Sequence, residues 1–194
     1  MQAVNNFQAE VERKLFTHNL GHACMGYIGY LKGYSYIHET FSDEYLLTVF
    51  NSALYETSQA LLKLYPDDLD PDEHREVIED IQIRFANPLI MDSVNRVARD
   101  PIRKLGPTDR LIGSAKLCID QEIFPQHIAC ICGAAMCYDY PEDDKAIKLQ
   151  KLIKKNGPLK TLEDISKIDS HGRLGSEIIA AYKWLTHMKK EWNS

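Results

Sequence analysis

The chain is 194 residues long and carries a formal net charge of −5, with 44% apolar and 26% charged residues. This length is enough for one compact domain with a hydrophobic core, and the acidic balance without a basic run argues against a nucleic-acid-binding surface. No apolar stretch reaches the roughly 20 residues that span a bilayer, and MQAVNNFQAEVERK lacks the pattern of a signal peptide. We therefore expect a cytoplasmic protein that binds neither nucleic acid nor membrane.

Helical periodicity dominates the chain from its N-terminal stretch, ERKLFTHNLGHACMGYIGYLKG at residues 12–33, onward. Ser42 is the expected cap of the second long helix, and the motif Asn87-Pro88 follows the third. Alternating β-patterns and hairpin turn signals are missing, so we predict one all-α domain of about eight to ten helices. After the N-terminal stretch, helices are predicted over residues 42–65, 71–86, 108–124, 125–139, 143–157, 158–168 and 175–192.

The glycine pattern argues against a dinucleotide site in this chain. No two of the ten glycines lie two residues apart, so a G-x-G-x-x-G turn is impossible, and no Walker loop is present. Val/Ile-rich strands that would build a parallel sheet are also missing. We predict no cofactor-binding residue here.

Lys14, Asn19 and His22 form an unusual polar group ahead of an apolar run. On an ideal helix Asn19 and His22 lie one turn apart, so both can address one oxygen, whereas Lys14 lies about 12 Å down the axis from His22. Convergence therefore needs the chain near Lys14 to leave the helix. The three groups suit alcohol oxidation, in which a base takes the hydroxyl proton and donors stabilise the reacting oxygen. The alternative is a solvated lysine beside a structural histidine.

Other polar and small residues have simpler interpretations. His18 and His22 share a helix face, but the Glu of an H-E-x-x-H metal site is absent, so we predict no metal and attach no role to His18. A pocket-lining role is open for His38 and Glu39. Two ridges, Gly26/Gly29/Gly33 and Tyr27/Tyr30/Tyr34, indicate close helix packing.

Five cysteines fit a reducing compartment, where free thiols behave as small buried hydrophobes. Cys130 and Cys132 point about 200° apart on a helix, so they cannot hold one ion together. We interpret these two and Cys137 as structural.

Two motifs resemble a known family. ERKLFTHNLGHA, residues 12–23, is similar to the K-x-x-x-x-N-x-x-H signature of the polyol-specific long-chain dehydrogenases, and its flanks resemble the mannitol-1-phosphate 5-dehydrogenases among them. NPLIMDSVNRVARDPIRKLGPTDRLIG, residues 87–113, resembles the second motif of the family, and SEIIAAYKWL resembles its last helix. These stretches cover nearly the whole chain in the same order.

The resemblance implies a fold like the C-terminal domain of the mannitol and 6-phosphogluconate dehydrogenases. It implies a zinc-independent reaction that interconverts mannitol 1-phosphate and fructose 6-phosphate with NAD. The matching lysine, Lys14, would be the general acid/base, while Asn19 and His22 hold the reacting oxygen. The residues that match the second motif, with expected substrate or phosphate contacts, are Arg103, Lys104, Asp109 and Arg110; a structural role is left open for Arg96 and Arg99.

The family carries a Rossmann domain before this region, and the present sequence lacks it. We therefore interpret residues 1–194 as the C-terminal substrate domain, with NAD bound by a Rossmann domain in cis or in trans. We expect this chain to be inactive alone. The alternatives are a mannitol 2-dehydrogenase or uronate reductase domain, and a non-catalytic helical interaction module in which Lys14, Asn19 and His22 point apart.

Overall fold

The computed structural model describes residues 7–192, so residues 1–6 and 193–194 of the predicted domain lie outside the described residues. Over this range the chain forms eleven α-helices and one 3-10 helix, and an isolated bridge between Tyr36 and Ser93 is its one β-type pairing. The predicted all-α fold is confirmed. The elements are α1 (Phe7–Phe16), α2 (His18–Leu31), η1 (Ile37–Ser42), α3 (Glu44–Leu64), α4 (Pro71–Phe85), α5 (Val94–Ala98), α6 (Pro101–Lys104), α7 (Ile112–Asp120), α8 (Gln126–Cys137), α9 (Asp144–Asn156), α10 (Pro158–Ser166) and α11 (Arg173–Trp192).

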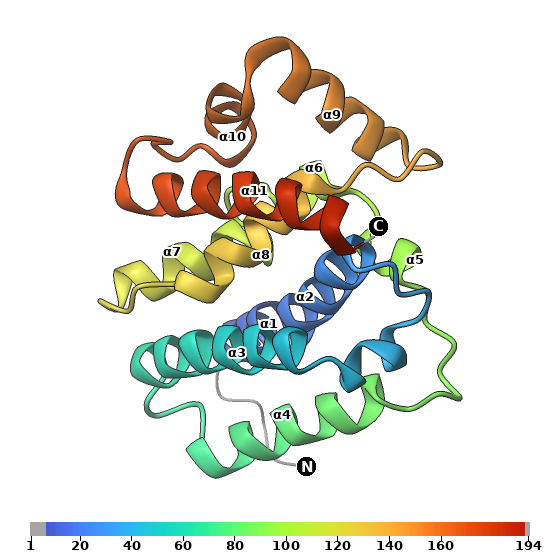
Figure 1. Ribbon diagram of the computed structural model, residues 1–194. Helices are drawn as coiled ribbons and strands as arrows, with labels where there is room; N and C mark the ends of the chain where they lie inside the picture. Colours follow the sequence, from blue (N-terminus) through green and yellow to red (C-terminus); the bar gives the residue numbers. More distant parts are fainter. Residues whose placement is uncertain (1–6, 193–194) are drawn as a thin grey trace.

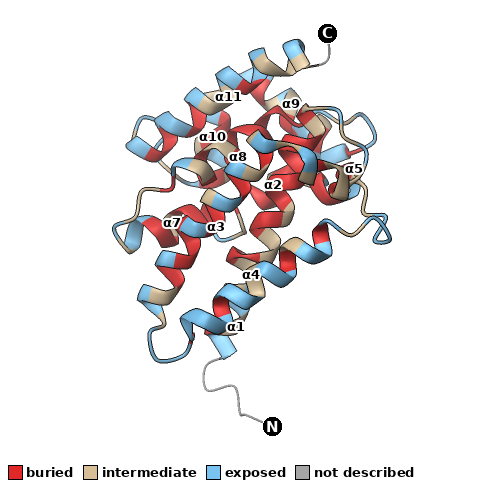
Figure 2. Ribbon diagram, turned by 60° about the horizontal axis from the view of Figure 1, so that its bottom comes forward, coloured by how far each residue is buried: buried red, intermediate tan, exposed pale blue. Residues whose placement is uncertain are grey.

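The helices stack in layers (Figure 1). Helix α4 lies at one end, α1, α2 and α3 form the next layer, and α8 with α11 lies beyond them, with α9 and α10 at the far end. Figure 2 shows that the buried residues run along α2 and α8, whereas α4 is largely exposed. Among the described helices none is long and apolar enough to cross a membrane.

Helix α2 is largely enclosed, and its glycines explain how its neighbours can approach it so closely. A Cβ on Gly21 would lie 2.7 Å from the Phe50 ring, and a Cβ on Gly26 would lie 2.8 Å from Val97. Small residues on these faces let the neighbouring helices approach closely. The predicted glycine ridge is therefore correct for Gly26 but wrong for Gly33, which lies beyond the helix end at φ 82°.

Gly33 ends α2 instead of packing against a neighbour. Its N–H donates to the carbonyl of Tyr30 at 3.1 Å, and the N–H of Tyr34 donates to the carbonyl of Gly29 at 3.0 Å. This pair of bonds is a Schellman motif, which needs the left-handed backbone that glycine adopts without strain. Tyr27 is buried, whereas the hydroxyls of Tyr30 and Tyr34 donate to Asp139 and Asp43, respectively.

Several predicted boundaries are wrong for local reasons. Asp43 caps α3 by accepting from the N–H of Leu46 at 3.0 Å, whereas Ser42 belongs to the preceding 3-10 helix. Helix α7 is shorter than residues 108–124, because Glu122 has φ 63° just after its end. Helices α5 and α6 are too short to show periodicity and were not predicted.

The cysteines lie in the helical core as expected. All five are free thiols, and four of them are buried, with Cys130 half-buried. Burial raises the pKa of the Cys118 thiol to about 12 and that of Cys137 to about 11. These thiols are therefore protonated and unreactive at neutral pH.

The contact between α8 and α11 gives a test of the packing. A Cβ on Gly133 would lie 2.7 Å from the backbone N of Tyr182 and 2.8 Å from the Cβ of Ala181. Because this neighbour is backbone that cannot turn aside, we expect Gly133→Ala to destabilise the fold by about 1–3 kcal/mol. Urea unfolding followed by circular dichroism measures this loss. Gly172→Ala, whose Cβ would meet nothing closer than 3.3 Å, is the control; equal losses in both variants would contradict the packing argument.

Candidate active site

The first candidate residues lie on two helices that meet at Thr17. The Thr17 hydroxyl and N–H both donate to the carbonyl of Arg13, at 2.5 and 3.0 Å, and its backbone angles of φ −115° and ψ −76° interrupt the helix. The ideal continuous helix from Lys14 to His22 is therefore broken, although Lys14 itself stays helical. Lys14 belongs to α1, and Asn19 and His22 belong to α2.

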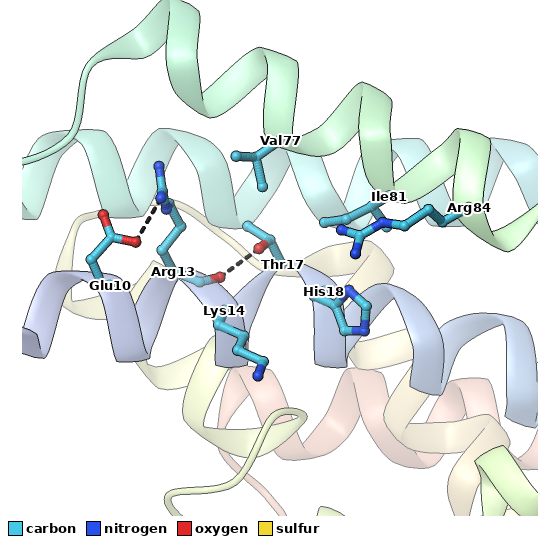
Figure 3. Close-up of a pocket in the computed structure, with 8 residues that line it drawn as sticks. All are labelled: Glu10, Arg13, Lys14, Thr17, His18, Val77, Ile81 and Arg84. Atoms are coloured by element: carbon cyan, nitrogen blue, oxygen red, sulfur yellow. Dashed lines mark hydrogen bonds and ion pairs between the residues drawn. The ribbon is translucent and has the colours of Figure 1, made fainter. Parts of the chain in front are cut away.

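Lys14 lies at the edge of a hollow between α1, the start of α2 and α4. The hollow has a volume of about 300 Å³. Lys14 lies on its rim and is exposed. Figure 3 shows Lys14 and His18 on the same side of their helices, with Arg84 reaching over from α4. The lining residues are Glu10, Arg13, Lys14, Thr17, His18, Val77, Ile81 and Arg84.

A second hollow of about 310 Å³ adjoins the first and contains His22. His18 and Arg84 line both hollows, so the two meet at these side chains. We call the combined space the α2–α4 cleft. The second hollow is lined by His18, His22, Ile37, Arg84, Phe85, Ile90, Asp92 and Arg96.

His22 is held by an aromatic ring and a carboxylate. Its ring stacks on Phe85 with centroids 4.6 Å apart, and its Nε2 lies 2.8 Å from an oxygen of Asp92. The two atoms are within ion-pair distance, but their geometry is not that of a hydrogen bond. The buried Nε2 of His22 therefore has no hydrogen-bond partner among the described residues. Burial lowers the pKa of His22 to about 4 and outweighs Asp92, which raises it, so the imidazole is neutral at pH 7.

The structure places Asn19 differently from the other two predicted residues. Lys14 and His22 line adjoining hollows, whereas Asn19 is half-buried on α2 and is not among the residues that line either one. Its side-chain amide also has no hydrogen bond to another residue within 7–192. His38 and Glu39, considered as pocket residues, lie outside the lining as well; Glu39 instead accepts from the N–H groups of Ser35 and Tyr36 at the start of η1.

Three of the four residues predicted from the second motif come together around one carboxylate. Asp109 accepts from Arg103 Nη1 at 2.8 Å and from Arg110 Nε at 2.9 Å. These charges hold the pKa of Asp109 below its ordinary value, against an upward effect of burial. Arg103 is exposed and Arg110 half-buried, so part of each guanidinium remains open to a ligand.

Lys104, the fourth of these residues, points the other way. Its ammonium is buried, donates to the carbonyls of Val97 and Arg99, and lies 5.4 Å from the centre of the Tyr27 ring. Burial, reinforced by the charges of Arg110 and Arg103, lowers the pKa of Lys104 to about 7. The lysine therefore supports the segment between α5 and α6 from inside.

The cleft also contains residues that could not be assigned to it from their spacing in the sequence. Asp92 faces His22 and also pairs with Arg96, while Phe85 and Arg84 come from the end of α4. Asp92 and Arg96 stand inside the second motif, so the signal was present in the sequence. Nothing in the spacing connected either of them to His22.

The described residues lack the groupings that hold a metal ion or a dinucleotide. The described residues contain no group of three His, Cys, Asp or Glu side chains that could hold a metal ion. Over the same range the helices supply neither a parallel sheet nor a glycine-rich turn, so these residues do not fit a dinucleotide.

Comparison with known proteins gives consistent results. The family model described as mannitol dehydrogenase C-terminal domain matches residues 6–185. Mannitol-1-phosphate 5-dehydrogenase of Thermoanaerobacter pseudethanolicus is 39% identical over 184 residues, which cover 95% of this chain and 47% of that protein. The Bacillus subtilis enzyme of that name is 39% identical over 176 residues, covering 91% and 46%. The chain thus spans about half the length of these relatives.

A solved structure supports the fold independently. The Pseudomonas fluorescens mannitol 2-dehydrogenase ternary complex with NAD and D-mannitol superposes with a TM-score of 0.71. The match covers 96% of this chain and 39% of that one, at 20% sequence identity. At this identity the likeness shows a shared fold.

The state of His22 can be measured directly. We expect NMR titration to give a pKa near 4 for His22, and Asp92→Asn to lower it further, because the carboxylate favours the protonated ring. Exposed His171 serves as the internal control, since its resonances should be the same in Asp92→Asn as in the natural chain. A His22 pKa at or above 6.5 would contradict the burial argument.

The same shift has a consequence for stability. The unfolded chain protonates His22 near pH 6.5 and the native chain near pH 4, so the native state loses stability as pH falls through this window. We expect the free energy of unfolding of the natural chain to fall by about 1–3 kcal/mol more than that of His22→Gln between these pH values. Urea titrations at both pH values measure the difference; parallel losses would contradict it.

Proposed function

Because the chain belongs to the mannitol dehydrogenase C-terminal domain family, we propose that it is the substrate domain of an NAD-dependent polyol-phosphate dehydrogenase. The proposed reaction interconverts mannitol 1-phosphate and fructose 6-phosphate. The α2–α4 cleft carries this proposal, since it places Lys14 and His22 in adjoining hollows. The names of the relatives, mannitol-1-phosphate 5-dehydrogenases, support the substrate class.

The proposed chemistry uses three side chains around one substrate oxygen. Lys14 accepts the hydroxyl proton as the alcohol is oxidised and returns it in the reverse direction. The imidazole of His22 donates a hydrogen bond to that oxygen, and the amide of Asn19, which lies outside the lining of both hollows, is the second proposed donor. The neutral state of His22 suits this role, because its N–H can donate while the ring carries no charge that would repel the ammonium of Lys14.

Neighbouring side chains hold the ring of His22 in place. Phe85 and Asp92 fix the ring of His22, and Arg96 holds Asp92 in turn. Arg103, Asp109 and Arg110 form a linked group with N–H donors suited to substrate oxygens. We assign Lys104 a positioning role, since two of its three N–H groups already bind backbone carbonyls.

The hydride acceptor belongs elsewhere in this proposal. NAD would accept the hydride from a Rossmann domain joined in cis or supplied in trans, and no residue of this chain is assigned to it. The exposure of Lys14 supports the division, because a second domain would have to cover the residue to exclude water. The 194-residue chain is expected to be inactive alone.

A hybrid enzyme tests the proposal. We expect a fusion of the first half of the Thermoanaerobacter pseudethanolicus relative to this chain to oxidise mannitol 1-phosphate with NAD⁺, and Lys14→Ala to reduce its kcat by about 10²–10⁴-fold through loss of the base. NADH absorbance measures both rates.

Lys151→Ala is the matched control, because Lys151 is an exposed lysine of α9 outside the lining of the cleft. This variant should retain the full rate. A near-normal rate in Lys14→Ala would remove the lysine from its role. An active 194-residue chain without the added half would overturn the division between two domains.

A further inference from the structure

His18 has no role in the proposed oxygen-binding group, yet it occupies the centre of the α2–α4 cleft. It is half-buried at the first position of α2 and lines both hollows. Its ring contacts Phe85 and His22 edge-on, with centroids 5.2 and 5.8 Å apart. The ring of His18 forms no hydrogen bond to another described residue, so its nitrogens are available to a ligand.

Arg84 is the other side chain common to both hollows, and it approaches from the opposite wall. It comes from the last turn of α4 and reaches over His18 (Figure 3). One of its nitrogens, Nη2, pairs with Asp80 at 2.7 Å on the same helix. The guanidinium has five N–H donors in a planar fork, so this single pair leaves donors for a second, bidentate partner.

The cleft is basic although the chain as a whole carries a net charge of −5. Its lining holds two carboxylates, Glu10 and Asp92, and these already pair with Arg13 and Arg96, respectively. The remaining basic side chains of the lining are Lys14, which pairs with no carboxylate of the described residues, and Arg84, which pairs with Asp80 outside the lining. A local positive excess in an acidic protein indicates that the site takes an anion.

The environment of His18 supports the same conclusion. Burial lowers its pKa, and the charges of Arg84, Lys14 and Arg110 lower it further, in that order. Asp80 opposes them by raising it, and His22 beside it is neutral. Three cations from α1, α4 and the segment before α7 thus surround a ring that stays neutral until an anion offsets their repulsion.

We propose that His18 and Arg84 bind the phosphate monoester of the substrate and thereby select phosphorylated polyols over free ones. This inference rests on the proposed function, because it places the ester in the same cleft as Lys14 and His22. The guanidinium of Arg84 contacts two phosphate oxygens, and His18 takes up a proton and donates to a third. The dianionic charge of the ester compensates the positive charges that surround it.

The proton uptake can be observed without any turnover. In the 194-residue chain, inorganic phosphate should raise the pKa of His18 by about one unit or more, corresponding to tenfold tighter binding to the protonated ring. Two-dimensional NMR of the histidine side chains, assigned through His18→Gln, measures the shift. His171 and His187, which are exposed and outside the cleft, should not move.

Matched arginine variants on one helix test the other contact. Arg84→Gln should abolish the phosphate-induced shift of His18, whereas Arg75→Gln should leave it unchanged. Arg75 lies on the same helix but pairs with Asp72 and Glu79 outside the cleft. Calorimetry should show mannitol 1-phosphate binding at least about 100-fold more tightly than mannitol, and Arg84→Gln should reduce this preference to below about tenfold.

Each outcome decides the inference. A phosphate effect on exposed histidines and His18 alike would identify an adventitious ion only. Stronger perturbation of His18 by NAD⁺ than by mannitol 1-phosphate would assign the anion site to the nucleotide instead, and an unchanged preference in Arg84→Gln would remove Arg84. Activity of the hybrid enzyme is read separately, so these results can fail while the proposed oxidation stands.

Discussion

The enclosure of α2 is the constraint on which the rest of the structure depends. Ten of its fourteen residues are buried, and glycines at positions 21, 26 and 29 bring Phe50, Val97 and Thr40 within van der Waals contact of its backbone. Such close packing fixes both the position and the rotation of the helix. The N-terminal part of α2, which carries the cleft residues His18 and His22, is therefore held in a fixed position.

The sequence predicts the fold class and the long helices well, because amphipathic periodicity and Pro or Gly signals act locally. Residues Lys14, Asn19 and His22 also stand out by spacing and by their resemblance to a family signature. The pairing of His22 with Asp92 could not be derived in the same way, since it joins residues 70 positions apart. Lys104 is a related case: its motif suggested a ligand contact, whereas its burial beneath α5 depends on tertiary packing.

Some charged side chains of this protein join helices to one another and are not open to a ligand. Lys32 pairs with Asp43 and lies over the rings of Tyr45 and Trp192, which ties the ends of α2, α3 and α11 together. Glu56 accepts from the N–H groups of His127 and Ile128 at the start of α8, and so joins α3 to that helix. These groups are therefore committed to the fold, whereas Lys14, His18 and Arg84 line the α2–α4 cleft.

The interruption at Thr17 separates the proposed proton acceptor from the proposed oxygen ligands. Lys14 belongs to α1, in which only Ala9 and Phe16 are buried. Asn19 and His22 belong to α2, in which most residues are buried. Thr17, a single buried residue, joins these two differently buried helices. Substitutions along the outer face of α1 can then alter the surroundings of the proposed proton acceptor while leaving the proposed oxygen ligands on α2 in place.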